Sequence, residues 1–201
     1  MLLAGVDEVG RGALFGPVVT AAVLVTVEDF SILQSLGVKD SKQLSPKRRA
    51  ELVPLITGQV LAWRIGHATI AEIESLNIRR ASLLAMKRAL VKLPQVPDRC
   101  LVDGRDAIPD LPFAQETIIR GDQSSEAIAA ASILAKVWRD ELIIRLGERY
   151  PQYGLAQHKG YGTKQHLSAL KKYGMTRLHR PQFCQKFVLN HDVLMTELEM
   201  F

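Results

Sequence analysis

The stretch LLAGVDEVGRG, residues 2–12, places three features side by side. The apolar run Leu2–Val6 is typical of a short buried strand. Two acids, Asp7 and Glu8, follow at once, and Gly10-Arg11-Gly12 comes one residue later. Glycines let backbone groups approach a ligand closely because they carry no Cβ. Negative charge beside bare backbone at the end of a strand therefore predicts a functional site here.

Strand-like and helix-like segments alternate along the rest of the chain. Residues 18–27, VVTAAVLVTV, are apolar and β-branched, which predicts a strand covered on both faces. Further strands are predicted at 59–66, 99–102 and 116–119, and helices at 46–56, 70–75, 78–93, 124–149 and 163–173. The first three strands can pair through short connections, whereas the later ones need helical crossovers. The predicted fold class is therefore α/β with a mixed sheet of five strands.

A change of charge divides the 201 residues. The net charge is +5, and no Asp or Glu occurs between Arg149 and His191. We expect a principal α/β domain at 1–150 and a small, basic, mainly helical segment at 151–201. The basic segment is either a solvated face or a binding surface for a polyanion such as a nucleic-acid backbone.

The composition argues against several other classes of protein. No apolar run approaches the roughly 20 residues of a membrane span. The first residues show no basic leader of the secretory type. Cys100 and Cys184 are the only cysteines, and their spacing suits neither a disulfide framework nor a zinc site. We expect a cytoplasmic protein that does not bind membranes.

Four acids share one local context, since each follows a predicted strand: Asp7, Glu8, Asp103 and Asp122. Neighbouring strand ends converge on one crevice of an α/β sheet, and clustered carboxylates repel one another unless a cation is present. Oxygen ligands favour Mg²⁺ or Mn²⁺, and two such ions about 4 Å apart can clamp both oxygens of a phosphoryl displacement. The competing interpretation is that these acids merely cap helices and end strands.

Asp7 is the candidate bridging ligand. Successive side chains of a strand point to opposite faces. Asp7 and Glu8 are therefore expected to share a metal site only if the strand is ending, or if Glu8 offers its backbone carbonyl. Gly10, Arg11 and Gly12 suit a nucleic acid pressed against the backbone, where a 2′-hydroxyl can be read by amide and carbonyl groups. A dinucleotide-binding fingerprint is disfavoured because a strand, not a helix, follows.

The motifs together resemble one family, bacterial type 2 ribonuclease H (ribonuclease HII). The resemblance covers residues 1–183, in the order DEVGRG (7–12), GPVVTAAV (16–23), DSKQLSPKRR (40–49), LVDG (101–104), RGDQSSEAIAAASILAKVWRD (120–140) and HKGYGTKQHLSAL (158–170). It implies a ribonuclease H-like fold. It also implies cleavage of RNA in RNA/DNA hybrids and incision 5′ to a ribonucleotide in duplex DNA, leaving 3′-hydroxyl and 5′-phosphate ends with Mn²⁺ or Mg²⁺.

The resemblance also assigns roles to residues. The metal-binding and catalytic acids would be Asp7, Glu8, Asp103 and Asp122. Gly10, Arg11 and Gly12 would sense the 2′-hydroxyl, and Tyr161 would stack on the sugar of the following deoxynucleotide. Lys42 is a candidate phosphate contact. Ser132 and Lys136, four residues apart on one helix face, are weaker substrate candidates.

The chain departs from the family pattern at three places. Ala13 stands where the family usually has proline, Phe15 where small residues are common, and residues 179–183 read HRPQF instead of the usual C-terminal element. His158, His166 and His179 are expected to be phosphate or surface groups and not metal ligands.

Two other functions compete with this one, with a monomer expected in each case. A non-catalytic binder of hybrids is disfavoured, because four carboxylates facing a polyanion would only weaken its binding. A related fold with another two-metal reaction, such as junction resolution, is the remaining alternative.

Overall fold

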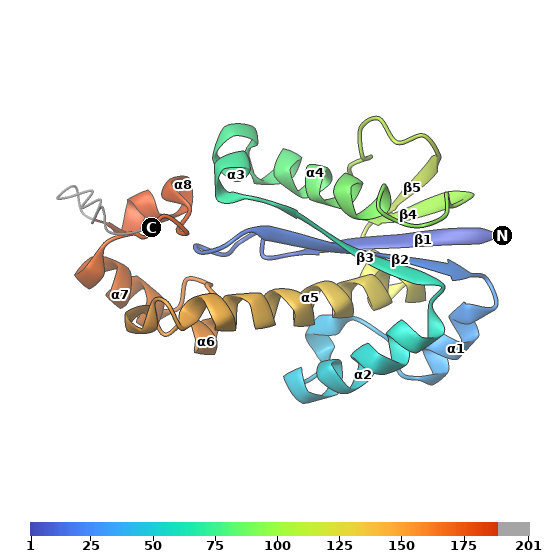
Figure 1. The fold of residues 1–201 in the computed structure, drawn as a ribbon, viewed down its shortest axis with the longest axis horizontal. Coiled ribbons are helices and arrows are strands. Elements are labelled where there is room, and N and C mark those ends of the chain that lie inside the picture. The colour runs from blue at the N-terminus through green and yellow to red at the C-terminus, as the bar shows by residue number, and fades with distance from the viewer. Residues whose placement is uncertain (189–201) are drawn as a thin grey trace.

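A mixed sheet of five strands forms the centre of the molecule, as a computed structural model describing residues 1–188 shows (Figure 1). The strands are β1 Leu2–Val9, β2 Val18–Thr26, β3 Ala62–Ala68, β4 Arg99–Asp103 and β5 Ala114–Ile118. Their order is β3-β2-β1-β4-β5. β1, β2 and β3 pair antiparallel, while β1, β4 and β5 pair parallel. The predicted α/β fold with a mixed five-stranded sheet is confirmed.

Helices cover both faces of this sheet. They are α1 Asp29–Ser35, α2 Pro46–Gln59, α3 Ile70–Leu76, α4 Ile78–Leu90 and α5 Glu126–Gly147. α3 and α4 lie on one side, and α5 with α1 and α2 lies on the other (Figure 1). The helix α1 was not predicted from the sequence.

The two cores follow from the alternation of side chains along β2. Ala21, Val23 and Val25 face α5, whereas Ala22 and Leu24 face α4. Both faces are therefore apolar, as predicted for this strand.

The sheet and α5 approach each other very closely at Gly5. A Cβ built on Gly5 would lie 2.4 Å from the backbone carbon of Ala127. The small residues of α5 permit this approach, since Ala127, Ala130 and Ala131 are fully buried. The close packing fixes α5 beneath β1, next to the acids at the end of that strand.

Asp7 and Glu8 lie within β1 and not beyond it, which corrects the expected strand end at Val6. The antiparallel ladder with β2 continues through Asp7–Ala21 and Glu8–Thr20 to Val9. The parallel ladder with β4 stops at Val6–Val102. The acids therefore occupy a stretch of β1 that is paired on one edge only.

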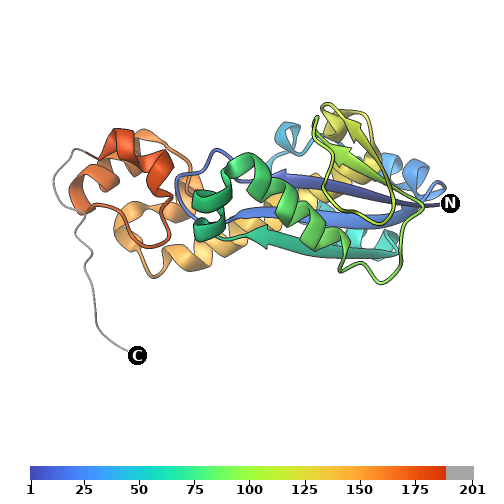
Figure 2. The same ribbon diagram turned by 90° about the horizontal axis from the view of Figure 1, so that it is seen from above.

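The basic C-terminal segment lies at the end of the molecule opposite the N-terminus (Figure 2). Its described helices are α6 Leu155–His158, α7 Lys164–Tyr173 and α8 Pro181–Cys184. Its apolar core also contains Leu14 and Phe15, from the connection between β1 and β2. The division at residue 150 stays a prediction, and residues 189–201 of the predicted segment lie outside the described part.

No helix within residues 1–188 is long and apolar enough to cross a membrane. The cytoplasmic location and the monomeric state remain predictions.

Candidate active site

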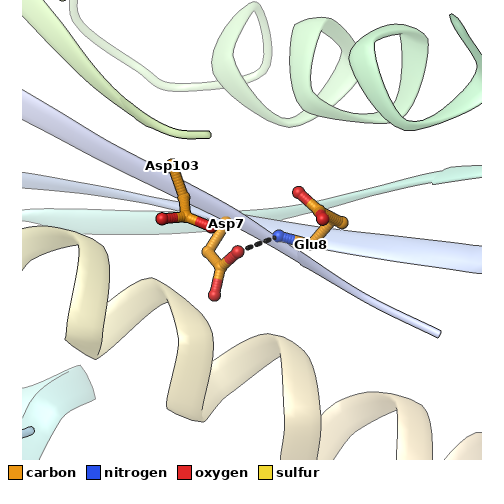
Figure 3. Close-up of side chains that lie close together, drawn as sticks. All are labelled: Asp7, Glu8 and Asp103. Atoms are coloured by element: carbon orange, nitrogen blue, oxygen red, sulfur yellow. Dashed lines mark hydrogen bonds between the residues drawn. The ribbon is translucent and has the colours of Figure 1, made fainter. Parts of the chain in front are cut away.

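Three carboxylates meet where β1 and β4 lie side by side (Figure 3). Asp7, Glu8 and Asp103 each offer one carboxylate oxygen, and these oxygens all lie within 4.8 Å of one another. We call this group the acidic corner. Asp7 is buried, with 5% of its surface exposed, while Glu8 and Asp103 are half-buried. Such a cluster can hold a metal ion through oxygen ligands alone.

Both acids of β1 contribute side-chain oxygens, although they start from opposite faces of the strand. Asp7 points toward α5, and its Oδ1 accepts a hydrogen bond from Glu8 N at 2.6 Å. Glu8 starts on the other face and accepts a hydrogen bond from Arg11 at 3.2 Å. β1 ends one residue after Glu8, and the Glu8 carboxylate lies near that of Asp7; whether Glu8 binds metal through its side chain or its carbonyl stays a prediction. The unpaired edge of β1 beyond Val6 leaves room for this longer side chain to reach the corner.

Burial and mutual repulsion raise the pKa values of the acidic corner. Burial is the main cause of the raised pKa of Asp7, and the charges of Glu8 and Asp103 add to it. Burial likewise raises the pKa of Glu8, with Arg11 partly opposing it. The ionised corner is thus short of positive charge, which is the situation that a bound cation relieves.

Asp122 lies close to the acidic corner without belonging to it. It is buried in the short 3₁₀ turn Gly121–Gln123, and its Oδ2 accepts a hydrogen bond from Lys42 Nζ at 3.3 Å. The preceding amide, Gly121 N, donates to Asp103 Oδ1 at 2.7 Å. Burial raises the pKa of Asp103, the Gly121 hydrogen bond opposes this, and the charge of Asp122 raises it further. Asp122 therefore interacts electrostatically with the corner through Asp103.

Buried polar groups hold the short 3₁₀ turn Ser41–Gln43, which contains Lys42, in place. Ser41 Oγ and Ser132 Oγ lie 2.9 Å apart, and Arg49 donates to the Ser41 carbonyl at 2.7 Å. Ser132 thus connects α5 to Ser41 from within the fold. Lys42 itself projects outward, with 81% of its side chain exposed.

The connection from β1 to β2, residues 10–17, is named the glycine loop here. Gly10 has φ +90°, and a Cβ there would lie 2.2 Å from Arg139 Nε, so both the backbone and the packing require glycine. Arg11 and Gly12 are exposed, and nothing lies within 4 Å of a Cβ built on Gly12. The loop therefore has a buried underside and an open upper surface beside Glu8.

Tyr161 lies between two basic side chains at the base of the glycine loop. Lys136 Nζ and the Arg139 guanidinium carbon are each 5.6 Å from the centroid of its ring. Lys136 also pairs with Asp140 at 2.8 Å. Leu14 N donates to the carbonyl of Gly160, the residue before Tyr161. The structure thus connects Tyr161 to the loop.

The expectation that three histidines are surface or phosphate groups is wrong. We call His158, His166 and His179 the histidine cluster, and all three are buried. The rings of His158 and His166 stack at 4.4 Å, and the Nε2 atoms of His166 and His179 lie 3.1 Å apart. The helix α7 is amphipathic, and His166 lies on its buried face. A segment rich in basic residues therefore need not expose all of them.

Two arginines that contact the glycine loop were not singled out from the sequence. Arg139 on α5 and Arg180 before α8 are both fully buried. Nothing in the spacing of the residues reveals this, because their partners lie more than 100 positions away. Between residues 151 and 188 the exposed basic residues are Lys164, Lys171, Lys172, Arg177 and Lys186.

A mixed sheet of this order, with a cluster of carboxylates where the parallel strands β1 and β4 meet, defines a hydrolase of the ribonuclease H class. The sequence profile of Ribonuclease HII matches residues 4–186, and the chain belongs to that family. Ribonuclease HII of Synechocystis sp. is 57% identical over 190 residues, which are 94% of this chain and 100% of that protein. Ribonuclease HII of Microcystis aeruginosa is 58% identical over 193 residues, which are 95% and 92% of the two chains.

Solved structures agree with this assignment. Ribonuclease H2 of Pyrococcus horikoshii OT3 is similar with a TM-score of 0.79 at 27% identity, over 93% of this chain and 97% of that one. The ribonuclease HII of Archaeoglobus fulgidus, solved in complex with PCNA, gives 0.71 at 26% identity over 96% and 98%. Bst-RNase HIII in complex with Mn²⁺ shares the fold, with a TM-score of 0.68 at 24% identity over 87% and 63%.

Proposed function

We propose that this enzyme cleaves the RNA strand of RNA/DNA hybrids and nicks duplex DNA 5′ to embedded ribonucleotides. The products would carry 3′-hydroxyl and 5′-phosphate ends. The observation that carries the proposal is the acidic corner, in which oxygens of Asp7, Glu8 and Asp103 lie within 4.8 Å of one another. Membership of the ribonuclease HII family supports the substrate class.

The donor set of the corner fits hard divalent cations. It consists of carboxylate oxygens with raised pKa values and has no sulfur or imidazole ligand. Mg²⁺ and Mn²⁺ both suit such ligands, and the structure of Bst-RNase HIII contains Mn²⁺. Two such ions, when bound, supply positive charge that activates water and stabilises the leaving 3′-oxygen.

The residues of the chain would hold the ions and the scissile phosphate in one place. Asp7, Glu8 and Asp103 would be ligands, with Asp122 as the fourth acid. Lys42 now pairs with Asp122 and is exposed, so it can exchange this carboxylate for a substrate phosphate. The exchange would place a positive charge on the substrate and release Asp122 for the metal.

Selection of RNA would lie on the other side of the corner. Gly10, Arg11 and Gly12 would present backbone groups to the 2′-hydroxyl, which is both a donor and an acceptor. The open space above Gly12 suits a close approach of the sugar. Tyr161 would stack on the next deoxyribose, where a 2′-hydroxyl would be crowded.

A duplex with one ribonucleotide tests the proposal. The purified protein should nick it with Mg²⁺ or Mn²⁺, and Asp7→Asn or Asp103→Asn should abolish the nicking while the circular dichroism spectrum stays unchanged. Asp110→Asn is the matched control, because Asp110 is exposed and pairs with Lys87 away from the corner. Full activity of either corner variant would overturn the assignment.

The same assay separates the competing functions. A non-catalytic binder would retain the hybrid without cutting it, and a junction-resolving enzyme would cut branched all-DNA duplexes. Cleavage of substrates with one or four ribonucleotides, and none of the all-DNA duplex, is the result that the proposal requires.

A further inference from the structure

Two buried cations lie beneath the glycine loop without an acidic partner. Arg139 and Arg180 are 0% exposed, and within residues 1–188 neither forms an ion pair with Asp or Glu. Burial lowers the pKa of both guanidinium groups, to about 9 for Arg180. Burying a charge without a counter-charge is unfavourable, so the contacts that these side chains make must compensate.

Arg139, which lies on α5, donates hydrogen bonds to three backbone carbonyls of other segments. Its Nη2 donates to Phe15 O at 2.9 Å, its Nε to Pro17 O at 3.1 Å and its Nη1 to Lys159 O at 3.0 Å. The first two carbonyls belong to the glycine loop. The third lies two residues before Tyr161. One planar guanidinium thus joins the loop to the segment that carries this tyrosine.

Arg180 binds the same loop at two other points. Its Nε donates to Gly16 O and its Nη1 to Arg11 O, both at 2.9 Å. Its backbone N donates to Leu14 O at 2.8 Å. The Arg11 carbonyl belongs to the central residue of the Gly10-Arg11-Gly12 turn, so Arg180 holds the part of the loop that lies beside Glu8.

We propose that Arg139 and Arg180 are positioning residues for ribonucleotide recognition. We call the pair the arginine anchor. It holds the glycine loop by four carbonyls, so that the open surface at Gly12 meets the substrate sugar in one fixed geometry. Arginine suits the role because its rigid fork of donors satisfies several carbonyls at once, which a lysine ammonium does not do in the same geometry. The inference rests on the proposed function.

A purely structural role for the anchor is the competing explanation, and binding selectivity separates the two. The measured quantity is the Kd of an all-DNA duplex divided by the Kd of the same duplex with one ribonucleotide. The full chain carries Asp7→Asn so that neither duplex is cut. Arg139→Lys and Arg180→Lys keep the positive charge and remove the fork, and thermal unfolding establishes that each variant is folded.

We expect the parent to prefer the ribonucleotide duplex. Each lysine variant should lower this preference about tenfold while changing the Kd of the all-DNA duplex less than about twofold, because a lost hydrogen-bonding geometry penalises only the substrate that uses it. Leu170→Val is the control, since Leu170 is fully buried in the same core and contacts no loop carbonyl through a polar group. It should lower the melting temperature and keep the preference.

Four results would overturn the inference. Lysine variants that keep the parental preference, or that weaken binding of both duplexes equally, would leave only a structural role. A parent that does not distinguish the two duplexes would refute the proposed function itself, and the inference with it. Hydrogen exchange of the unmodified protein is independent of any variant: the amides of Leu14 and Gly16 should exchange as slowly as those of β2, and rapid exchange would show that the loop is not held.

Discussion

The acidic corner and the arginine anchor bury charges of opposite sign, yet they satisfy them in different ways. The carboxylates of Asp7, Glu8 and Asp103 face one another, and the charges of Glu8 and Asp103 add to the raised pKa that burial gives Asp7. The guanidinium groups of Arg139 and Arg180 face neutral backbone carbonyls. Arg11 compensates the charge of the corner only in part, through Glu8, so a bound cation can supply further positive charge. The anchor is largely satisfied within the protein, with Arg180 Nη2 as the exception. Carboxylates that face one another indicate a site that a cation can occupy, and guanidinium groups that face backbone carbonyls indicate a loop that is held in place.

The largest expected effect comes from Asp7→Asn, which removes one negative charge from the acidic corner. Activity with Mg²⁺ or Mn²⁺ should fall by more than about 1000-fold, because the amide is a poor ligand for a hard cation. Without divalent cations the same variant should be more stable by about 1–2 kcal/mol, since a buried, repelled charge is removed and the amide oxygen can still accept from Glu8 N. Thermal and urea unfolding in a chelator measure the second effect. A decrease in stability would mean that the corner is not strained by its own charge.

The glycine loop offers the next largest effect, through Gly10→Ala and its control Gly12→Ala. A Cβ at Gly10 would adopt φ +90° and meet Arg139 Nε at 2.2 Å, so we expect a loss of about 2–4 kcal/mol in the free energy of unfolding. The same substitution at Gly12 meets nothing within 4 Å and should change stability by less than about 0.5 kcal/mol. Urea unfolding of the two variants compares them. Equal losses would show that Arg139 does not fill the space beside Gly10.

These two regions also differ in how much of them the sequence could predict. The corner was predictable because each of its acids adjoins an apolar run of a strand, and the register of the sheet brings β1 and β4 together. The predicted end of β1 at Val6 was wrong. The length of β1 depends on its ladder with β2, which no property of residues 2–6 reveals. Asp122 was expected among the ligands; it lies buried beside the corner and pairs with Lys42, and its role as a ligand stays a prediction.

The C-terminal segment was harder to interpret because its basic residues divide between surface and core. Arg180 and the three histidines contribute to the same charge pattern as Lys171 and Lys172, yet the former are buried and the latter exposed. Only the packing of α7 against the glycine loop decides this. Long-range contacts such as Arg180 to Arg11 leave no periodic signal along the chain.

The histidine cluster gives a smaller effect, which depends on pH. His179 Nδ1 accepts from Thr176 N, so its Nε2 carries the proton and donates to His166 Nε2, while His166 Nδ1 donates to Tyr161 O. This arrangement requires neutral rings, and burial lowers the pKa of His166 to about 4 and that of His179 to about 3.

The sign of the pH dependence follows from these lowered pKa values. The unfolded chain binds protons near pH 6.5 and the folded chain does not, so stability is complete above pH 6.5 and falls as the pH drops toward 4. We expect a loss on the order of 2 kcal/mol over this range. The His166→Asn variant should be less stable than the parent at pH 8. Its free energy of unfolding should also change less than that of the parent as the pH falls from 8 to 4. His67→Asn on β3 is the comparison: burial also lowers the pKa of this histidine, but not to the values of His166 and His179, so the slope should flatten less than in His166→Asn. An unchanged slope in His166→Asn would mean that the cluster does not set the acid sensitivity.

The smallest expected effect concerns the contact between the acidic region and the substrate. Lys42→Ala removes an exposed charge that pairs with Asp122, so the fold should be unaffected, because exposed pairs contribute little to stability. KM for a single-ribonucleotide duplex should rise about three- to tenfold, and the salt dependence of binding should weaken by about one phosphate contact. Lys39→Ala, three residues earlier and also exposed, should leave both quantities unchanged. If Lys42→Ala instead lowered kcat with KM constant, Lys42 would act on the transition state and not by binding a ground-state phosphate, since only a contact made equally in both states changes KM alone.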